Sequence, residues 1–287
     1  MVFVGDRKER KMKTIDISDW TQFSQRAYSK SYLDESGTLM LKTVDADNTE
    51  SVAYLTEEYR ISDAANKLGI PTAKVFDFVK TSNNEVGIVY EYIREKVSCS
   101  RAISREPERL NEFMQIYSNV VRKFHDIEAD PNLIPSFESK VFSGLDATSI
   151  FSEKEKELLK ERFVKLPQGN KCIHGDLTPS NVIHSPSGDF IIDLGMLSYG
   201  NPLFDFANFN HQVEYLPDDV TMMLFHFDKA TLKKCWEIYA QDYFGSKDMR
   251  EIDEYLKPYA KFAPLPLLNV ASDLPSIIVA KEFILSE

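Results

Sequence analysis

The segment KCIHGDLTPSNVIHSPSGDFIIDLG, residues 171–195, constrains the fold of this chain more than any other part of it. Two short runs, NVIHS and DFIID, flank a turn-forming Pro-Ser-Gly sequence, and this pattern predicts a small hairpin. Asn181 opens the first run and Asp193 closes the second. Because the strands of a hairpin run antiparallel, its two outer ends lie close together, so both side chains can face one site.

A third oxygen-bearing side chain, Asp176, precedes Asn181 on the loop that enters the hairpin. Phosphoryl transfer requires that the phosphates and metal ions of a nucleotide be held, and that a further group orient the attacking hydroxyl. Amide and carboxylate oxygens suit Mg²⁺, so Asn181 and Asp193 are candidate metal ligands, and Asp176 is the candidate general base. The segment alone leaves a second interpretation open, an ordinary polar surface hairpin without chemistry.

Composition narrows the choice of partners. The 287 residues include 45 acidic and 34 basic side chains, and the formal net charge of -11 argues against binding nucleic acid. The three cysteines lack metal-ligand spacing, so we expect reduced thiols in the cytoplasm. No apolar stretch reaches membrane-spanning length and no signal peptide is evident, so we expect no membrane partner. Composition leaves the oligomeric state open.

The first third of the chain, residues 1–93, has a strand-rich pattern with one helix. AYSKSYLD and TLMLKTV predict one hairpin, and AKVFDFVK and VGIVYEYI predict a second. Between the hairpins lies a predicted helix of about five turns, which Gly69 and then Pro71 end as a left-handed cap and a helix breaker. We expect the charged residues 1–13 to form a disordered leader.

From residue 94 to residue 287 the pattern becomes mainly helical. PERLNEFMQIYSNVVRKFHDI is strongly amphipathic, and SEKEKELLKERFV places Ser152 and Glu155 at the positions of a capping box. TLKKCWEIYAQDYFG predicts a further helix. We therefore expect an α+β protein with two lobes, an N-terminal antiparallel sheet with one long helix and a C-terminal, mainly helical lobe that carries the catalytic loop.

HGDLTPSN followed by IIDLG resembles the catalytic loop and metal motif of the aminoglycoside phosphotransferase and choline kinase family, relatives of the protein kinases. YGNPLFDFANF resembles the segment that follows in that family, and the stretch from Leu224 onward resembles a bacterial branch of it. The resemblance implies a bilobal, protein-kinase-like fold. It also implies an enzyme that uses ATP and Mg²⁺ to transfer a γ-phosphate to a small-molecule hydroxyl, such as that of an aminoglycoside, choline or a sugar.

The same resemblance implies a role for each matching position. Asp176 matches the catalytic base, and Asn181 and Asp193 match the metal ligands. His174 matches a residue that supports the loop without taking part in the chemistry. Asp205 matches a residue that braces the catalytic loop through hydrogen bonds.

A kinase-like fold also needs a strand lysine for the phosphates and a helix glutamate that holds this lysine. Lys42 ends the apolar run LMLK, a strand position. Glu58 is the polar member of a helical stripe whose other members are Tyr54, Ile61, Ala65 and Leu68. A carboxylate on such a face is costly unless it is paired, so we expect Glu58 to form an ion pair with Lys42. Both are then candidate nucleotide-binding residues.

Two further segments bear on the nucleotide. VYEYI resembles the segment that joins the lobes in the family, where the carbonyl of Glu91 and the amide of Ile93 would contact adenine. A plain strand that leaves the sheet is the alternative interpretation. FSQRAYSKSY stands where protein kinases have a glycine-rich loop, yet it contains no glycine, so the choice between ATP and GTP stays open.

The acceptor side is less constrained. One predicted helix carries four aromatic residues: Trp236, Tyr239, Tyr243 and Phe244. They could form an aromatic cage for a quaternary amine, but their helical spacing favours packing in the core. His211 and Glu214 are candidates for the wall of an acceptor pocket, although nothing in the sequence requires it.

Two other functions compete with the small-molecule kinase. A catalytically idle nucleotide-binding module on the same fold agrees with the missing glycines, whereas the complete set of site residues argues against it. A protein kinase is disfavoured because the loop contains His-Gly-Asp and because no A-P-E segment follows Gly195.

Overall fold

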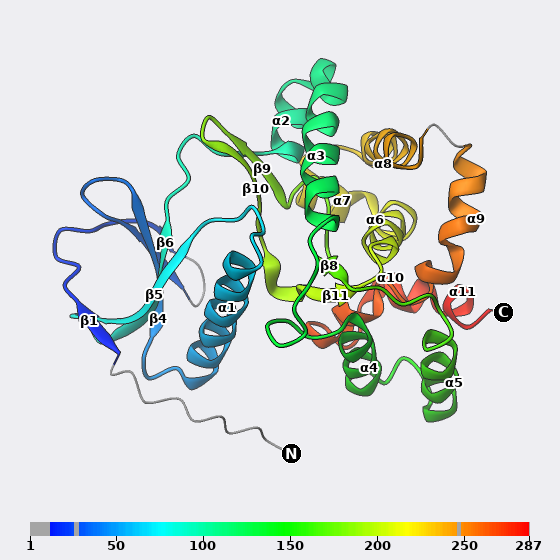
Figure 1. The fold of residues 1–287 in the computed structure, drawn as a ribbon, viewed down its shortest axis with the longest axis horizontal. Coiled ribbons are helices and arrows are strands. Elements are labelled where there is room, and N and C mark those ends of the chain that lie inside the picture. The colour runs from blue at the N-terminus through cyan, green and yellow to red at the C-terminus, as the bar shows by residue number, and fades with distance from the viewer. Residues whose placement is uncertain (1–11, 26–28, 246–247, 287) are drawn as a thin grey trace. The chain divides into compact units, whose positions relative to one another are not determined.

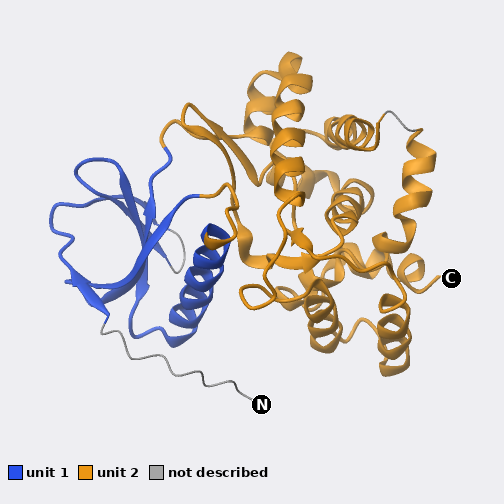
Figure 2. Ribbon diagram, viewed as in Figure 1, with its two compact units in different colours: residues 1–66, 73–93 blue, residues 67–72, 94–287 orange. Residues whose placement is uncertain are grey.

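The computed structural model describes residues 12–25, 29–245 and 248–286 (Figure 1). The chain divides into two compact units, residues 1–66 with 73–93 and residues 67–72 with 94–287 (Figure 2). The expected leader falls mostly outside the described residues, although Lys13 already belongs to a strand.

The first unit contains a six-stranded sheet with the strand order β1-β5-β6-β4-β3-β2. Its strands are β1 (Lys13–Ile15), β2 (Thr21–Gln25), β3 (Lys30–Leu33), β4 (Leu39–Asp45), β5 (Val75–Thr81) and β6 (Glu85–Glu91). Both predicted hairpins are confirmed, as the antiparallel pairs β3–β4 and β5–β6. The expected antiparallel pairing holds for every pair of neighbouring strands except β1 and β5, which run parallel, so the sheet is mixed. A strand of three residues is too short to show a hydrophobic period in the sequence.

Helix α1 (Thr49–Lys67) packs on one face of this sheet and ends shortly before Gly69, whose φ of +75° confirms the predicted left-handed cap. Its contacts with β4 and β6 form a buried cluster: Val44, Leu55, Val86, Ile88 and Tyr90. The other face has a cluster of its own: Ile17, Tyr32, Leu41, Val79 and Val89. Side chains alternate along a strand, so Lys42 of β4 faces the same side as Val44, the side of α1.

The prediction for the apolar face of α1 is wrong in one position, Tyr54. Tyr54 is 70% exposed, whereas its neighbour Leu55 is 1% exposed and packs against the sheet. Tyr54 precedes Glu58 by four residues and Leu55 precedes it by three, and both spacings place two side chains on one helix face. The spacing therefore could not decide between them.

The second unit is mainly helical, as predicted. Its helices are α2 (Cys99–Arg105), α3 (Leu110–His125), α4 (Phe137–Ala147), α5 (Glu153–Phe163), α6 (Leu203–Tyr215), α7 (Asp218–Phe225), α8 (Lys229–Phe244), α9 (Met249–Ala260), α10 (Pro275–Val279) and α11 (Lys281–Leu285). Its strands are β7 (Val97–Ser98), β8 (Lys171–Ile173), β9 (Val182–Ser185), β10 (Gly188–Ile191) and β11 (Ser198–Gly200). The predicted hairpin is β9–β10, and the predicted capping box of Ser152 and Glu155 opens α5. Among the described residues, no helix combines the length and the apolar character needed to cross a membrane.

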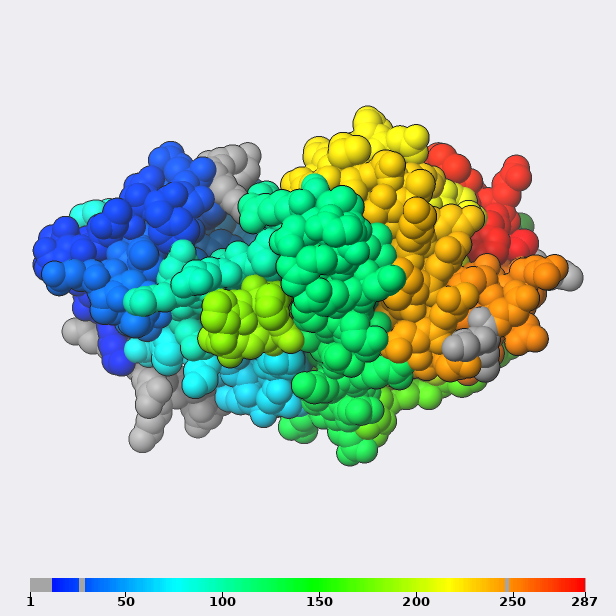
Figure 3. All heavy atoms as spheres, turned by 90° about the horizontal axis from the view of Figure 1, so that it is seen from above, coloured from blue at the N-terminus to red at the C-terminus, as the bar shows by residue number. Residues whose placement is uncertain are grey.

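The core of the second unit is rich in aromatic rings, and α3 and α8 lie side by side at its surface (Figure 3). Phe206 of α6 stacks on Tyr239 of α8 with 4.6 Å between ring centroids, and Tyr239 meets Tyr117 of α3 at 4.9 Å. Trp236 and Tyr239 are 2% and 1% exposed. Their predicted packing in the core is confirmed, which leaves no accessible cage at these two residues.

Candidate active site

The loop between β8 and β9 turns sharply at Gly175. Its φ is +82°, a conformation that L side chains rarely adopt. A Cβ atom at this position would lie 2.8 Å from Cβ of Met196, closer than two packed carbons approach. Glycine therefore lets the loop pass Met196 immediately before Asp176.

Asp205 of α6 fixes the backbone of this loop. Its carboxylate accepts hydrogen bonds from the N–H groups of His174 at 2.9 Å and of Gly175 at 2.7 Å. Oδ2 also lies 3.0 Å from Nε2 of His125. Asp205 is 1% exposed, and a carboxylate at that depth needs such donors. The predicted bracing by Asp205 is confirmed.

His174 joins the loop to the far end of the hairpin. Its buried ring accepts a hydrogen bond at Nδ1 from the N–H of Asp176 at 3.2 Å, and its Nε2 lies 2.9 Å from the carbonyl oxygen of Ile192. Because Nδ1 accepts, the ring proton belongs on Nε2, which donates to that carbonyl. His174 therefore supports the loop, as expected.

Two amides of α6 that the sequence analysis did not identify also reach the loop. Nδ2 of Asn208 donates to the carbonyl of Gly175, and Nε2 of Gln212 donates to Oδ1 of Asp176, each at 2.7 Å. Together with Asp205 they are spaced by three and then four residues, so all three lie on one face of α6. This spacing within LFDFANFNHQVEY was the available signal.

The carboxyl of Asp176 is enclosed by protein, although part of the residue reaches solvent. Burial raises its pKa to about 6, and the negative charge of Asp193 acts in the same direction. His174, Gln212 and Asn181 act in the opposite direction. At neutral pH the group is mostly ionised, yet it remains basic enough to accept a proton.

The outer ends of the β9–β10 hairpin meet as predicted. The N–H of Ile192 donates to the carbonyl of Asn181 at 2.9 Å, which brings Asn181 next to the residue that precedes Asp193. Nδ2 of Asn181 donates to the backbone carbonyl of Asp176 at 2.8 Å and to its Oδ2 at 3.3 Å. With its amide nitrogen committed to Asp176, Asn181 presents Oδ1 as a ligand for a cation.

Asp193 has a φ of +62°, and holding a non-glycine residue in this left-handed region costs about 1–3 kcal/mol. The residue is exposed, and within the described parts of the chain no hydrogen bond or ion pair engages its carboxylate. Such strain often accompanies function. The oxygens of Asn181 and Asp193 fit Mg²⁺, which commonly takes one or two protein ligands and completes its shell with phosphates and water. The described residues contain no cluster of three or more His, Cys, Asp or Glu side chains suited to a metal.

The ion pair predicted in the first unit is confirmed. Nζ of Lys42 lies 2.8 Å and 2.6 Å from the two carboxylate oxygens of Glu58, with 29% and 26% of the two side chains exposed. The hydroxyl of Tyr90, which the sequence analysis did not identify, donates to Glu58 at 3.2 Å. Burial, and then the charge of Glu58, raise the pKa of Tyr90 well above its ordinary value, so this hydroxyl keeps its proton and acts as a donor.

The two residues predicted to contact adenine lie at the end of β6. Glu91 is the last residue of this strand, and its N–H donates to the carbonyl of Lys74 at 2.8 Å. Ile93 follows two positions later and is 4% exposed. Their contact with adenine stays a prediction.

The contacts that the structure shows for His211 and Glu214, the two candidates for an acceptor pocket, go to residues outside the catalytic loop. His211 is 4% exposed and contacts the Tyr215 ring in a tilted arrangement at 4.8 Å between centroids. It has no hydrogen-bond partner at either ring nitrogen among the described residues. Burial lowers its pKa to about 4, so the ring is neutral at pH 7. Glu214 is exposed and lines a shallow hollow with Lys229 and Lys233.

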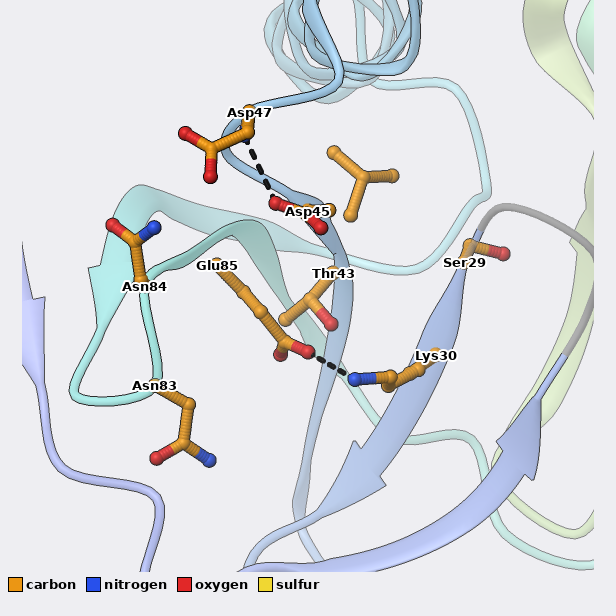
Figure 4. Close-up of a pocket in the computed structure, with 9 residues that line it drawn as sticks. Ser29, Lys30, Thr43, Asp45, Asp47, Asn83, Asn84 and Glu85 are labelled. Carbon is orange, nitrogen blue, oxygen red and sulfur yellow. Dashed lines mark hydrogen bonds and ion pairs between the residues drawn. The ribbon is translucent and has the colours of Figure 1, made fainter.

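A separate hollow of about 270 Å³ lies within the first unit (Figure 4). Lys30 and Glu85 point toward one another across it, 2.5 Å apart, with Thr43 beside them (Figure 4). Thr43 and Asp45 alternate with Lys42 along β4, so their side chains face the opposite side of the sheet. None of the predicted nucleotide-binding residues lines this hollow.

Comparison with known proteins identifies the family of the chain. A model described as the phosphotransferase enzyme family matches residues 19–255. The chain belongs to this family. The motifs HGDLTPSN and IIDLG, and with them the whole segment from β8 to β10, lie inside the matched range. No curated protein matches the sequence.

Solved structures show the fold of the chain. A thermostable mutant of aminoglycoside phosphotransferase APH(4)-Ia, in its apo form, aligns with a TM-score of 0.55 at 14% identity, over 93% of this chain and 89% of that one. A choline/ethanolamine kinase family protein from Mesorhizobium loti aligns with a TM-score of 0.52 at 15% identity, over 92% and 85% of the two chains. The expected protein-kinase-like fold is confirmed.

Proposed function

We propose that this protein is a small-molecule kinase that uses ATP and Mg²⁺ to phosphorylate a hydroxyl of its substrate. The observation that carries the proposal is the set of contacts around Asp176. Its carboxylate receives amide hydrogen bonds from Asn181 and Gln212, and the charge of Asp193 acts on it. The Lys42–Glu58 pair of the first unit supports the same class of reaction.

Asp176 would accept a hydrogen bond from the acceptor hydroxyl and orient its oxygen for attack on phosphorus. Because the transition state of phosphoryl transfer is loose, this orientation matters more than early removal of the proton. A pKa of about 6 leaves Asp176 ionised at neutral pH and able to take the proton as the new bond forms. Its backbone is already held by His174, so little reorganisation is needed.

Asn181 and Asp193 would hold Mg²⁺, which when bound with a nucleotide offsets the negative charge of the phosphates. Lys42 would contact the α- and β-phosphates through its ammonium group, and Glu58 would keep that group in place. The hydroxyl of Tyr90 in turn holds Glu58. The carbonyl of Glu91 and the amide of Ile93 would contact adenine.

The acceptor is proposed as a small amino alcohol, aminoglycoside or sugar. The two similar structures are named as an aminoglycoside phosphotransferase and a choline/ethanolamine kinase family protein, which supports acceptors of this kind. The net charge of -11 is compatible with a cationic acceptor. The three cysteines are buried and free, which suits the reducing cytoplasm, the location that we propose.

A screen for ADP release from Mg·ATP tests the proposal. The acceptors would be aminoglycosides, choline, ethanolamine, homoserine and sugars, with water alone as the baseline and the Asp193→Ala protein as the blank. We expect one acceptor class to raise ADP release above the baseline, with roughly a 100-fold loss in Asp193→Ala because a metal ligand is removed. If no acceptor gives ADP release while ATP still raises the melting temperature, the protein is the catalytically idle nucleotide-binding module.

A further inference from the structure

Both carboxylate oxygens of Asp176 are engaged by side-chain amides. Nε2 of Gln212 donates to Oδ1 at 2.7 Å, and Nδ2 of Asn181 donates to Oδ2 at 3.3 Å. The shorter of the two bonds comes from α6, a helix outside the catalytic loop and the hairpin. Gln212 is 7% exposed, and a buried amide is costly unless its polar atoms find partners.

The other contacts of α6 with the loop go to the backbone. Asp205 binds the N–H groups of His174 and Gly175, and Asn208 binds the carbonyl of Gly175. These bonds already fix where the loop lies. The hydrogen bond of Gln212 differs because it goes to the side chain of Asp176, so its effect falls on the orientation of the carboxylate.

The orientation of a carboxylate is otherwise weakly determined. Its terminal torsion is broad, because rotation about the bond between an sp³ and an sp² carbon has a shallow barrier. One amide, that of Asn181, would still allow the group to pivot about the contact at Oδ2. A second donor at Oδ1, carried by a helix that is bonded to the same loop, fixes the plane.

We propose that Gln212 is a positioning residue for phosphoryl transfer. It holds the carboxylate of Asp176 in the plane from which an oxygen lone pair can meet the acceptor hydroxyl. The alternative is that Gln212 only satisfies buried polar groups and contributes to folding. This inference rests on the proposed function, since it assigns a task within that reaction.

Gln212→Leu tests the role, because leucine nearly matches the volume and cannot donate a hydrogen bond. The matched control is Asn210→Ala on the same helix, whose amide points to Asp253 at 3.5 Å instead of to the loop. ADP release from Mg·ATP is measured with water alone and then with choline, ethanolamine and an aminoglycoside. We expect kcat of Gln212→Leu to fall roughly 10- to 100-fold, with KM for ATP changed less than about threefold, and Asn210→Ala to match the wild type.

A double mutant separates positioning from folding. If Gln212 acts through Asp176, adding Gln212→Leu to Asp176→Asn lowers the residual turnover by less than about twofold, whereas independent effects multiply. Multiplying effects, or unchanged kcat in Gln212→Leu while the wild type is active, would overturn this inference and leave the proposed function intact. A wild-type protein that releases no ADP under any of these conditions overturns the proposed function, and this role with it.

Discussion

Lys42 and Glu58 form an ion pair in which Nζ lies within 2.8 Å of both carboxylate oxygens. The two residues come from β4 and α1, and the hydroxyl of Tyr90 adds a further bond to Glu58. The pair therefore holds a strand lysine in a defined position with 29% of its side chain exposed. Such a position suits a lysine ammonium group that binds the phosphates of a nucleotide.

We expect Lys42→Ala to weaken ATP binding roughly 10- to 100-fold, because one charged contact with phosphate is lost. The free energy of unfolding should fall by less than about 1 kcal/mol, because a partly exposed ion pair contributes little to stability. Calorimetric titration with Mg·ATP and a urea melt measure the two quantities. Lys80→Ala, which changes an exposed lysine on strand β5 of the same sheet, is the control and should bind ATP as the wild type does. Equal affinity in the two variants contradicts the role of Lys42.

The raised pKa of Asp176 predicts a gain of stability when its charge is removed. The unfolded chain loses the proton of this carboxyl near pH 3.8, whereas the folded chain loses it only near pH 6. The fold therefore loses stability as the pH rises between these values, and the loss is complete above about pH 6. At pH 7, without nucleotide or Mg²⁺, the free energy of unfolding of Asp176→Asn should therefore be roughly 1–2 kcal/mol higher than that of the wild type. The gain should shrink toward pH 4, where wild-type Asp176 is also protonated. Urea melts at both pH values measure it, and a loss of stability at pH 7 contradicts the account.

His211 predicts a pH effect of the opposite sign. Burial lowers its pKa to about 4 from an ordinary value of 6.5. Between these pH values the unfolded chain therefore binds a proton at this histidine and the folded chain does not. This contribution to stability is complete above about pH 6.5 and is lost as the pH falls toward 4, by up to roughly 3 kcal/mol. His211→Leu removes the titrating group, and its unfolding free energy should fall less between pH 7 and pH 4.5 than that of the wild type. Parallel pH profiles for the two proteins would exclude the effect.

Gly175→Ala should disturb both the fold and the loop. The new Cβ would meet Met196 at 2.8 Å at a φ of +82°, so we expect a loss of roughly 2–4 kcal/mol in unfolding free energy. Gly245→Ala is the matched control, because its φ of +74° carries the same backbone strain while nothing lies within 4 Å of its Cβ. We expect the control to lose only about 1 kcal/mol. Thermal or urea melts compare them, and equal losses would show that the contact with Met196 has no effect.

The parts of the fold that the sequence predicted correctly are those with strong local patterns. The β9–β10 hairpin has turn residues between two apolar runs, α3 has a strong amphipathic period, and α5 opens with a capping box. The choice between Tyr54 and Leu55 failed because both satisfy helical spacing, and only packing against the sheet decides. The parallel pairing of β1 was missed because three residues and a distant partner leave no local signal.

In the candidate site, too, some contacts were predicted from the sequence and others were missed. The Lys42–Glu58 pair was predicted because a carboxylate on an apolar helix face requires a partner. Tyr90 was missed because a single tyrosine in the sequence does not reveal that it will meet Glu58. Gln212 was missed although its helical spacing from Asp205 was a signal, because that spacing does not show which face of the helix meets Asp176. Such contacts come from the tertiary packing of α6 and β6.

The most direct test of the central claim is ³¹P NMR of the products formed from Mg·ATP and the acceptor found in the screen, with wild-type protein and Asp176→Ala in parallel. The wild type should give a phosphomonoester resonance that grows in proportion to ADP, and Asp176→Ala should form it at least roughly 100-fold more slowly while binding ATP normally. The same phosphomonoester formed at an equal rate by both proteins would contradict the assignment of Asp176 as the base and, with it, the account of this site.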